Sequence, residues 1–191
     1  CMAMGSDLDH ISMAGSAHVN LVVSYSGLAA AKVLQKQFGT PYVAGVPFGI
    51  GFADILARAL RSAAKSGKSS MPCADRRNVS GGELAVVGES ISAGSLARAV
   101  EAESGRSVRV LCPLETTGEL TAEGDILIPD EDSAARQFTL AGGVIADPLY
   151  KPICPDGVPF YSLPHEAFSG RCYRKRIPNL INRKLKLEGA I

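Results

Sequence analysis

Short apolar runs alternate with longer amphipathic stretches at the start of the chain. Residues 19–23 (VNLVV) form a run that is too short for a helix and rich in β-branched residues, which predicts a strand buried on both faces. Residues 27–38 are helix-forming with one apolar side that includes Phe38, and a glycine follows them. A second run at 41–45 predicts another buried strand. Because β-α-β units are right-handed and parallel, the turns after the two strands should lie side by side.

The pattern that follows divides the chain into two lobes. Residues 52–65 are amphipathic and predict a helix, after which the sequence is polar and broken by Gly, Pro, Ser and Asn. This composition is typical of a connection between domains, so we expect a first lobe at 1–68, a linker at 69–82 and a second lobe at 83–191. The linker should be a solvated segment or a basic loop that faces an anion or a partner.

The second lobe repeats the alternation of strands and helices. Strands are predicted at 84–87, 108–112, 144–146 and 158–163, with a short extended run at 125–128. Helices are predicted at 92–104, 132–141 and 177–187, and a helix capped by Ser6 at 7–17. The alternation predicts an α/β fold of two Rossmann-like lobes, each a mainly parallel, doubly wound sheet flanked by helices. The terminal helix is expected to return to the first lobe.

Charge and hydropathy exclude two classes of partner. The chain has 20 basic and 19 acidic residues, a formal net charge of +1 and no Trp, so it offers no global field or stacking surface to nucleic acid. No apolar run approaches the roughly 20 residues that cross a bilayer, and no secretory signal is recognisable. We therefore expect a cytoplasmic protein that binds neither nucleic acid nor membrane.

Five cysteines are spaced widely and irregularly. They are Cys1, Cys73, Cys112, Cys154 and Cys172, and no two form a CxxC pair. This spacing excludes the local signatures of zinc ribbons, thioredoxin-like redox pairs and ferredoxin clusters. We expect reduced structural thiols and assign no metal ligand in this chain. A sequence that begins at Cys1 instead of Met also suggests a piece of a longer protein.

Known nucleotide-binding signatures are missing. The stretch VVGESISAG has neither the GxGxxG spacing nor the lysine of a P-loop. Its residues Gly88, Glu89 and Ser90 nevertheless precede a helix, whose free backbone N–H groups could bind a small anion or a polar ligand. The alternative is a plain turn between strand and helix.

Three turns are expected to meet in a cleft between the lobes. They are SYSG at 24–27, GVPFG at 45–49 and PHEAFSG at 164–170, each after a predicted strand, where α/β proteins bind ligands. His165 could ligate a metal, transfer a proton or hold a loop carbonyl. A hydrolase triad of a serine with His165 and Asp147 lacks the GxSxG elbow. The candidate residues are His165 for catalysis and Ser24, Tyr25, Ser26, Phe48, Gly88, Glu89 and Ser90 for binding of a cofactor or ligand.

Several motifs occur in an order that is known from one protein family. They are VNLVVSYSGLAAAKVLQKQFGTPYVAGVPFG, GELAVVGESISAGSLARAVEAESG, VIADPLY and GVPFYSLPHEAFSG. This order resembles the second and third domains of nitrogenase component 1 type proteins over nearly all 191 residues. The resemblance implies Rossmann-like lobes around a cleft that holds a metallocluster or a tetrapyrrole and receives electrons from an ATP-driven iron protein.

The resemblance also implies positions for two ligands. The cluster-binding cysteine of the nitrogenase catalytic subunit lies in an HCYRS segment that is similar to VSYSG, which places Ser24 at the cysteine. The cluster-binding histidine precedes a YSG triplet in a segment similar to PHEAFSG, which places Pro164 there and His165 one residue later. Because a serine hydroxyl is a poor ligand for soft metals, we do not expect nitrogen reduction on an iron-molybdenum cluster. No segment here resembles the family's first domain, whose cysteines hold an iron-sulfur cluster.

Two functional hypotheses follow. The first is a portion of a nitrogenase-like oxidoreductase, whose cleft binds a substrate or metallocofactor for reduction with electrons from a related subunit and an ATP-dependent iron-protein reductase. Alone, this chain should be inactive, because the iron-sulfur cluster is expected only in the full-length protein or complex. The second is a non-catalytic scaffold module that holds a cofactor or small ligand. A solute-binding protein would share the two lobes, but no export signal is recognisable.

Overall fold

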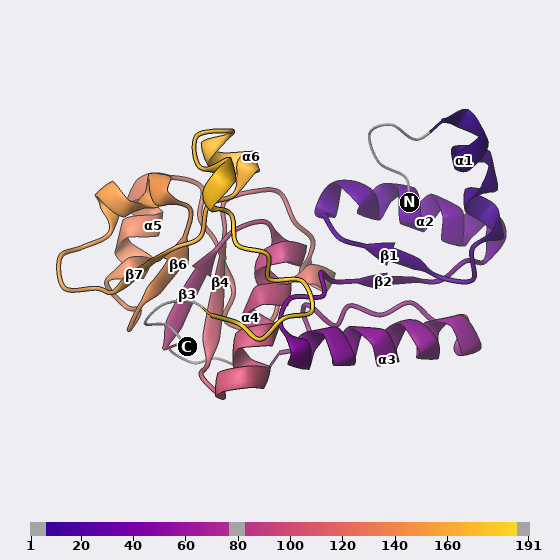
Figure 1. Cartoon of the computed structure of the whole chain (residues 1–191), viewed down its shortest axis with the longest axis horizontal. Coiled ribbons are helices and arrows are strands. Elements are labelled where there is room, and N and C mark those ends of the chain that lie inside the picture. The colour runs from indigo at the N-terminus through magenta and orange to yellow at the C-terminus, as the bar shows by residue number, and fades with distance from the viewer. Residues whose placement is uncertain (1–6, 77–82, 187–191) are drawn as a thin grey trace.

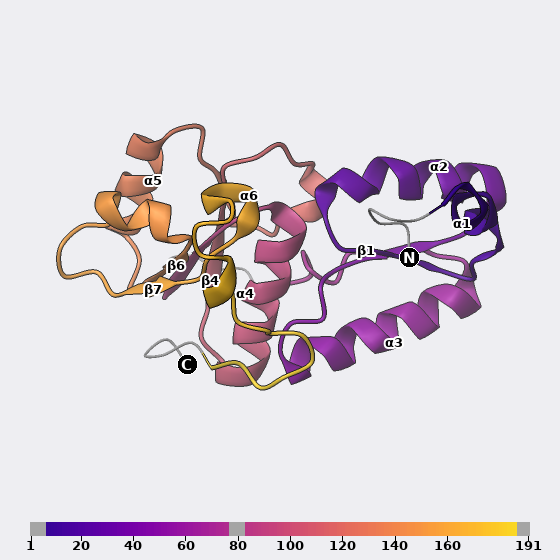
Figure 2. The same cartoon turned by 45° about the horizontal axis from the view of Figure 1, so that its top comes forward.

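The computed structural model describes residues 7–76 and 83–186, which form two α/β lobes (Figure 1). The first lobe begins with α1 (Leu8–Ser12) and contains two parallel strands, β1 (Asn20–Val22) and β2 (Tyr42–Ala44). The helices α2 (Leu28–Phe38) and α3 (Ile50–Ser66) lie on opposite sides of this strand pair (Figures 1 and 2). Gly45 N–H donates to the Val22 carbonyl (3.0 Å), so the turns after the two strands lie side by side as predicted.

The second lobe is built on a five-stranded parallel sheet with the order β5-β4-β3-β6-β7. The strands are β3 (Leu84–Val87), β4 (Val108–Cys112), β5 (Ile126–Leu127), β6 (Val144–Ala146) and β7 (Phe160–Ser162). Its helices are α4 (Ser90–Ser104), α5 (Glu131–Phe138) and the short α6 (Glu166–Ser169). The chain starts this sheet in the middle and winds outward in both directions, which confirms the doubly wound, parallel arrangement.

Burial along β3 explains how the sheet joins the two lobes. Leu84 and Val86 belong to one core cluster with α4 and the first lobe, whereas Ala85 and Val87 belong to a second cluster with α5. Successive side chains of a strand point to opposite faces, so an unbroken apolar run fills both cores. The first cluster continues into the first lobe through Phe52 of α3, and the lobes therefore share a core.

Two details of the first lobe differ from the prediction. The predicted run 19–23 is not buried on both faces, because Leu21 in β1 is 41% exposed and Val23, directly after the strand, is 51% exposed. Among the described residues β1 pairs only with β2, so it lies at an edge. Phe38 is also exposed, and its ring lies over Gly15. The predicted Ser6 cap lies outside the described residues, and Asp7 caps α1 instead.

Residues before the second lobe pack against the fold. Ser70 forms a parallel bridge to β2, and Cys73 is fully buried. The side chain of Arg76 forms a buried ion pair with Asp125. The expectation of a solvated or anion-facing linker is therefore wrong for these residues. Residues 77–82 lie outside the described part, and the boundary between the lobes stays a prediction.

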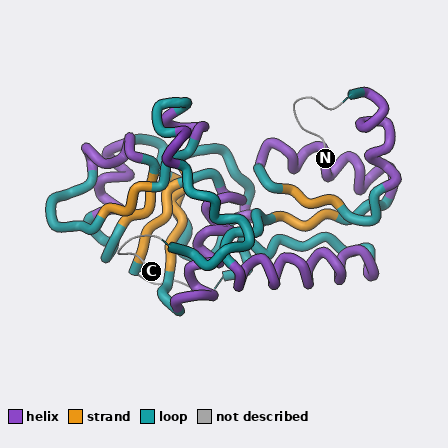
Figure 3. The backbone as a smooth tube through the Cα atoms, in the orientation of Figure 1, coloured by secondary structure: helices purple, strands orange, loops and turns teal. Residues whose placement is uncertain are grey.

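The terminal helix predicted at 177–187 is wrong, because the described part of this segment is irregular (Figure 3). It does return to the first lobe, where Gly49 N–H donates to the Leu180 carbonyl (3.0 Å). Leu185 N–H donates to the Glu103 carboxylate of α4 (2.9 Å). Leu180 and Leu185 are both buried. The irregular backbone allows both side chains to reach the core, and this burial stabilises the segment in place of a helix.

Candidate functional site

A pocket lies at the point where the strand order of the large sheet reverses. The carboxyl ends of β3 and β6 border it, and open α/β sheets bind ligands at this kind of switch point. Phe48 contributes from the first lobe, Gly88 from the turn after β3, Asp147 from the turn after β6, and His165 and Phe168 from the segment after β7. The cavity has a volume of ≈ 50 Å³. Residues far apart in the sequence thus share one hollow between the lobes.

Asp147 holds the second lobe's side of this pocket together. Its side chain accepts hydrogen bonds from Leu149 N (3.0 Å), His165 N (2.7 Å) and Ser169 Oγ (2.8 Å). The residue is 2% exposed, and a buried carboxylate needs such donors to offset the loss of water. Asp147 therefore fixes the turn after β6 to the start of α6.

His165 is exposed and serves as the N-cap of α6. Its Nδ1 atom accepts a hydrogen bond from Ala167 N (3.1 Å), and its ring meets the edge of Phe168 at 5.7 Å between centroids. Because a backbone N–H must donate, the neutral ring carries its proton on Nε2. Binding of a metal at Nε2 would move that proton to Nδ1, against the Ala167 N–H. The geometry therefore suits a hydrogen-bond donor at Nε2 better than a metal ligand.

The contacts of His165 also argue against a hydrolase triad. A triad needs the aspartate on the Nδ1–H of the histidine, with the serine at Nε2. Here Asp147 contacts the backbone N–H of His165, and the ring Nδ1 is occupied by Ala167. Ser169, the serine bound to Asp147, is buried. These groups position a turn and do not form a nucleophile and base.

Glu89 caps α4 and joins it to the first lobe. Its carboxylate accepts hydrogen bonds from Ile91 N (3.1 Å), Ser92 N (3.0 Å) and, across the lobes, Tyr25 N (2.7 Å). The helix therefore begins at Ser90 and not at residue 92. Since a carboxylate already occupies the free N–H groups, the geometry argues against a docked anion at this helix end.

The structure brings only some of the predicted site residues together. Phe48, Gly88 and His165 line the switch-point pocket. The turn at 24–26 does not line it and is linked to it through Glu89, while Ser24 Oγ and Ser26 Oγ lie 3.2 Å apart. Ser90 faces a second cavity. Sequence reasoning missed Asp147 as the anchor of the pocket, although Asp-Pro directly after a buried strand is a recognisable helix-start signal.

Protein ligands for a metal do not gather at this pocket. Within residues 7–76 and 83–186, no three His, Cys, Asp or Glu side chains are arranged to hold a metal ion. Burial raises the pKa of the Cys73 thiol to about 12 and also raises that of Cys112, so neither supplies a thiolate near neutral pH. The described residues therefore do not fit a metallocluster that is ligated by this chain alone.

Comparison with known proteins adds one finding. A model of the family described as Nitrogenase component 1 type Oxidoreductase matches residues 1–109, which is more than half of the chain. No curated protein and no solved structure matches it. Among the described residues, none of the helices combines the length and apolar character that a membrane span requires.

Proposed function

Because this chain belongs to the nitrogenase component 1 type oxidoreductase family, we propose that its switch-point pocket binds a molecule for reduction with electrons from a partner. The observation that supports this is the meeting of Phe48, Gly88 and His165 in one hollow between the lobes. A related subunit and an ATP-dependent iron-protein reductase are the proposed sources of electrons. A metallocofactor in this pocket would be held by such further subunits or domains, since residues 7–76 and 83–186 offer no ligand set of their own.

His165 supplies a proton to the molecule that is reduced. Each electron pair added to a carbon or nitrogen centre must be matched by protons, and a histidine donates one from its charged form, in which both ring nitrogens carry protons. Protonation of Nδ1 opens the hydrogen bond from Ala167 N, the Nε2 proton is transferred to the molecule, and loss of the Nδ1 proton to water restores the capped ring once Nε2 is protonated again. Asp147 cannot fill this role, because its oxygens accept three hydrogen bonds and it is buried. Asp147 instead positions the histidine through its backbone.

The pocket opens when its molecule enters. Small-molecule sites usually have volumes of about 300–1,000 Å³, and the present cavity of ≈ 50 Å³ has room for only a few atoms. Phe48 lies in the first lobe and Phe168 in the second, and both are half-buried lining residues whose rings can change rotamer. Displacement of these rings enlarges the hollow without unfolding the sheet.

Anaerobic production of the protein as its gene encodes it, together with an ATP-dependent iron protein, tests the proposal. Iron analysis and absorption spectroscopy should detect a redox centre in the complex, and ATP-dependent consumption of reductant should appear when small-molecule extract is added. His165→Asn keeps a capping oxygen for Ala167 N but removes the imidazole. We expect this variant to fold normally and to lower the rate by about 10²–10⁴-fold.

Two results would count against the proposal separately. A complex that is free of iron, colourless and unable to consume reductant contradicts the reductase function. A full rate in His165→Asn contradicts only the role of the histidine as a proton donor.

The second hypothesis is a module that binds the same molecule without turnover. The hydrogen bond from Ala167 N to the His165 ring favours this hypothesis, because a histidine that caps a helix has a structural role that needs no catalytic step. Under this hypothesis, a ligand from the extract should bind the chain and shift the signals of the pocket residues, while the complex consumes no reductant with or without the ligand.

A further inference from the structure

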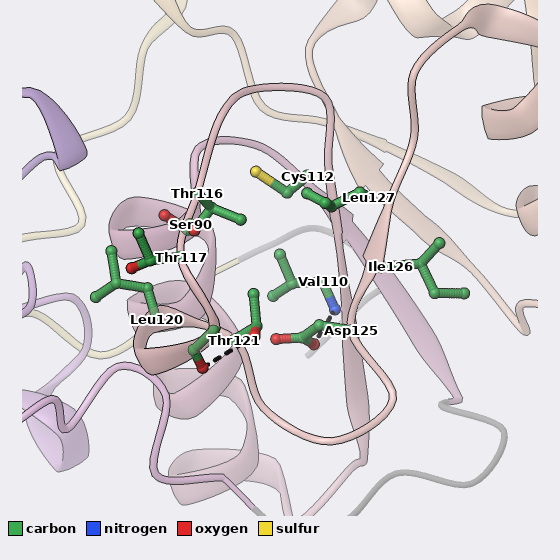
Figure 4. A pocket seen from close by; sticks show the side chains of 11 residues that line it. Ser90, Val110, Cys112, Thr116, Thr117, Leu120, Thr121, Asp125, Ile126 and Leu127 are labelled. Atoms are coloured by element: carbon green, nitrogen blue, oxygen red, sulfur yellow. Dashed lines mark hydrogen bonds between the residues drawn. The ribbon is translucent and has the colours of Figure 1, made fainter.

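A larger cavity lies on the other side of the Gly88–Ser90 turn from the switch-point pocket. Its volume is ≈ 430 Å³, and it is bounded by Ser90, the end of β4, β5 and the loop at 113–122 (Figure 4). Figure 4 shows the loop side chains Thr117 and Leu120 across from Val110 of β4. None of the residues that line this cavity also lines the switch-point pocket. The cavity is therefore separate from the site proposed above.

The lining combines an apolar base with hydroxyl groups. Val110, Leu120 and Leu127 supply aliphatic surface, whereas Thr116, Thr117 and Thr121 supply hydroxyls on the loop. A cavity at the carboxyl ends of parallel strands, with mostly apolar walls and a few polar groups, has the usual character of a small-molecule site. The volume also falls in the range of such sites.

The charges around the cavity disfavour an ionic ligand. Asp125 lines it, but its carboxylate accepts from Val110 N (3.0 Å) and Ala122 N (2.8 Å) and pairs with Arg76. Among the residues that the structure describes, no Lys, Arg or His lines the cavity, so an anion would find no counter-charge there. A cation would find a carboxylate that is already neutralised. Only an uncharged molecule avoids an unpaired charge in this hollow.

One polar group of the lining lacks a partner. Thr116 Oγ1 is buried and makes no hydrogen bond, whereas Thr121 Oγ1 donates to the Gly118 carbonyl (3.2 Å). A buried hydroxyl without a partner is costly, and a ligand atom that pairs with it removes the cost. Rotation about the Cα–Cβ bond of Thr116 exchanges its hydroxyl and methyl positions and can turn the hydroxyl toward the cavity.

We propose that this cavity is a binding site for an uncharged, largely apolar small molecule that carries a hydrogen-bond acceptor. The aliphatic side chains cover its apolar part, and Thr116 donates to the acceptor. The loop is held before binding by the buried Leu120 side chain and the hydrogen bond from Ala122 N to Asp125, and Glu119 adds an exposed ion pair with Lys32 of α2. Binding then requires rotation of the Thr116 side chain but no rearrangement of the loop backbone.

Titration with quinoline, observed by two-dimensional NMR of the labelled chain, tests the site. Quinoline is a neutral bicyclic ring with one acceptor nitrogen, and it should shift the amide signals of residues 116–121. Thr116→Val removes the unpaired hydroxyl at nearly constant volume, so it should leave the melting temperature unchanged or raise it. The same variant should weaken quinoline binding about fivefold to tenfold.

Matched probes and variants separate the outcomes. Thr116→Ser keeps the hydroxyl and should bind as the parent chain does, and Thr139→Val, on a hydroxyl that donates to Arg136 outside the cavity, should have no effect. Quinoline-2-carboxylate, which adds a negative charge to the same ring, should bind at least tenfold more weakly. The proposal is overturned if millimolar quinoline leaves residues 116–121 unshifted or shifts His165 and Phe168 instead. Equal binding by Thr116→Val, or by the carboxylate, overturns the assigned contact or the selectivity for an uncharged molecule.

Discussion

Removal of the Glu89 carboxylate should loosen the contact between the lobes more than loss of a helix cap alone would. Glu89→Ala deletes the acceptor of Ile91 N and Ser92 N, which cap α4, and also the acceptor of Tyr25 N in the first lobe. Loss of a cap costs about 0.5–2 kcal/mol. Loss of a hydrogen bond to a charged group adds about 1.5–3 kcal/mol. The free energy of unfolding should therefore fall by about 3 kcal/mol, a large share of the stability of a typical domain.

Asp130→Ala is the matched control for this variant. Asp130 caps α5 through Ser133 N (2.7 Å), but it makes no contact between the lobes. Urea unfolding of both variants gives their relative stability, and amide hydrogen exchange at Tyr25 reports the inter-lobe bond itself. Glu89→Ala should be the less stable of the two and should exchange faster at Tyr25. Equal loss of stability, together with unchanged exchange at Tyr25, would refute the role of Glu89 between the lobes.

Three further predictions concern the packing beneath α4. Gly94→Ala should destabilise the protein by about 1–3 kcal/mol in urea unfolding, because the added Cβ would lie 2.7 Å from the Cys73 carbonyl oxygen. Gly118→Ala is the control, since its Cβ would have no heavy atom within 4 Å, and it should leave the stability unchanged. The free energy of unfolding should fall as the pH rises from about 9 to about 12, because burial raises the pKa of the Cys73 thiol from 9.0 to about 12 and the unfolded state therefore binds fewer protons in this range. The decrease should be up to about 4 kcal/mol, and it should be absent in Cys73→Ala when unfolding is measured across the same pH range. Arg76→Met should cost about 3–5 kcal/mol, because it leaves Asp125 buried without its counter-charge, and adding Asp125→Asn should recover part of that loss if the charge is the cause.

The sequence alone was sufficient for elements whose burial is decided locally. The strands at 84–87 and 108–112 have the predicted bounds. Strands that are buried on both faces are nearly continuous apolar runs, so their ends are visible in the sequence. Gly39 and Gly105 follow α2 and α4 with φ of 71° and 73°, a conformation that glycine adopts without strain. The sequence also predicted that the turns with Phe48 and His165 face one cleft, and both residues line the switch-point pocket.

Tertiary structure decided the features that depend on a distant neighbour. The segment 177–186 has a plausible helical pattern, but Leu180 and Leu185 bind along α4 and the first lobe as an irregular chain. The sequence predicted Glu89 to be part of a ligand-binding turn. The structure shows that its carboxylate accepts a hydrogen bond from Tyr25 N and so connects the two lobes. A hydrophobic pattern states which side chains leave water, whereas the partner that covers them is set by the packing of the whole chain.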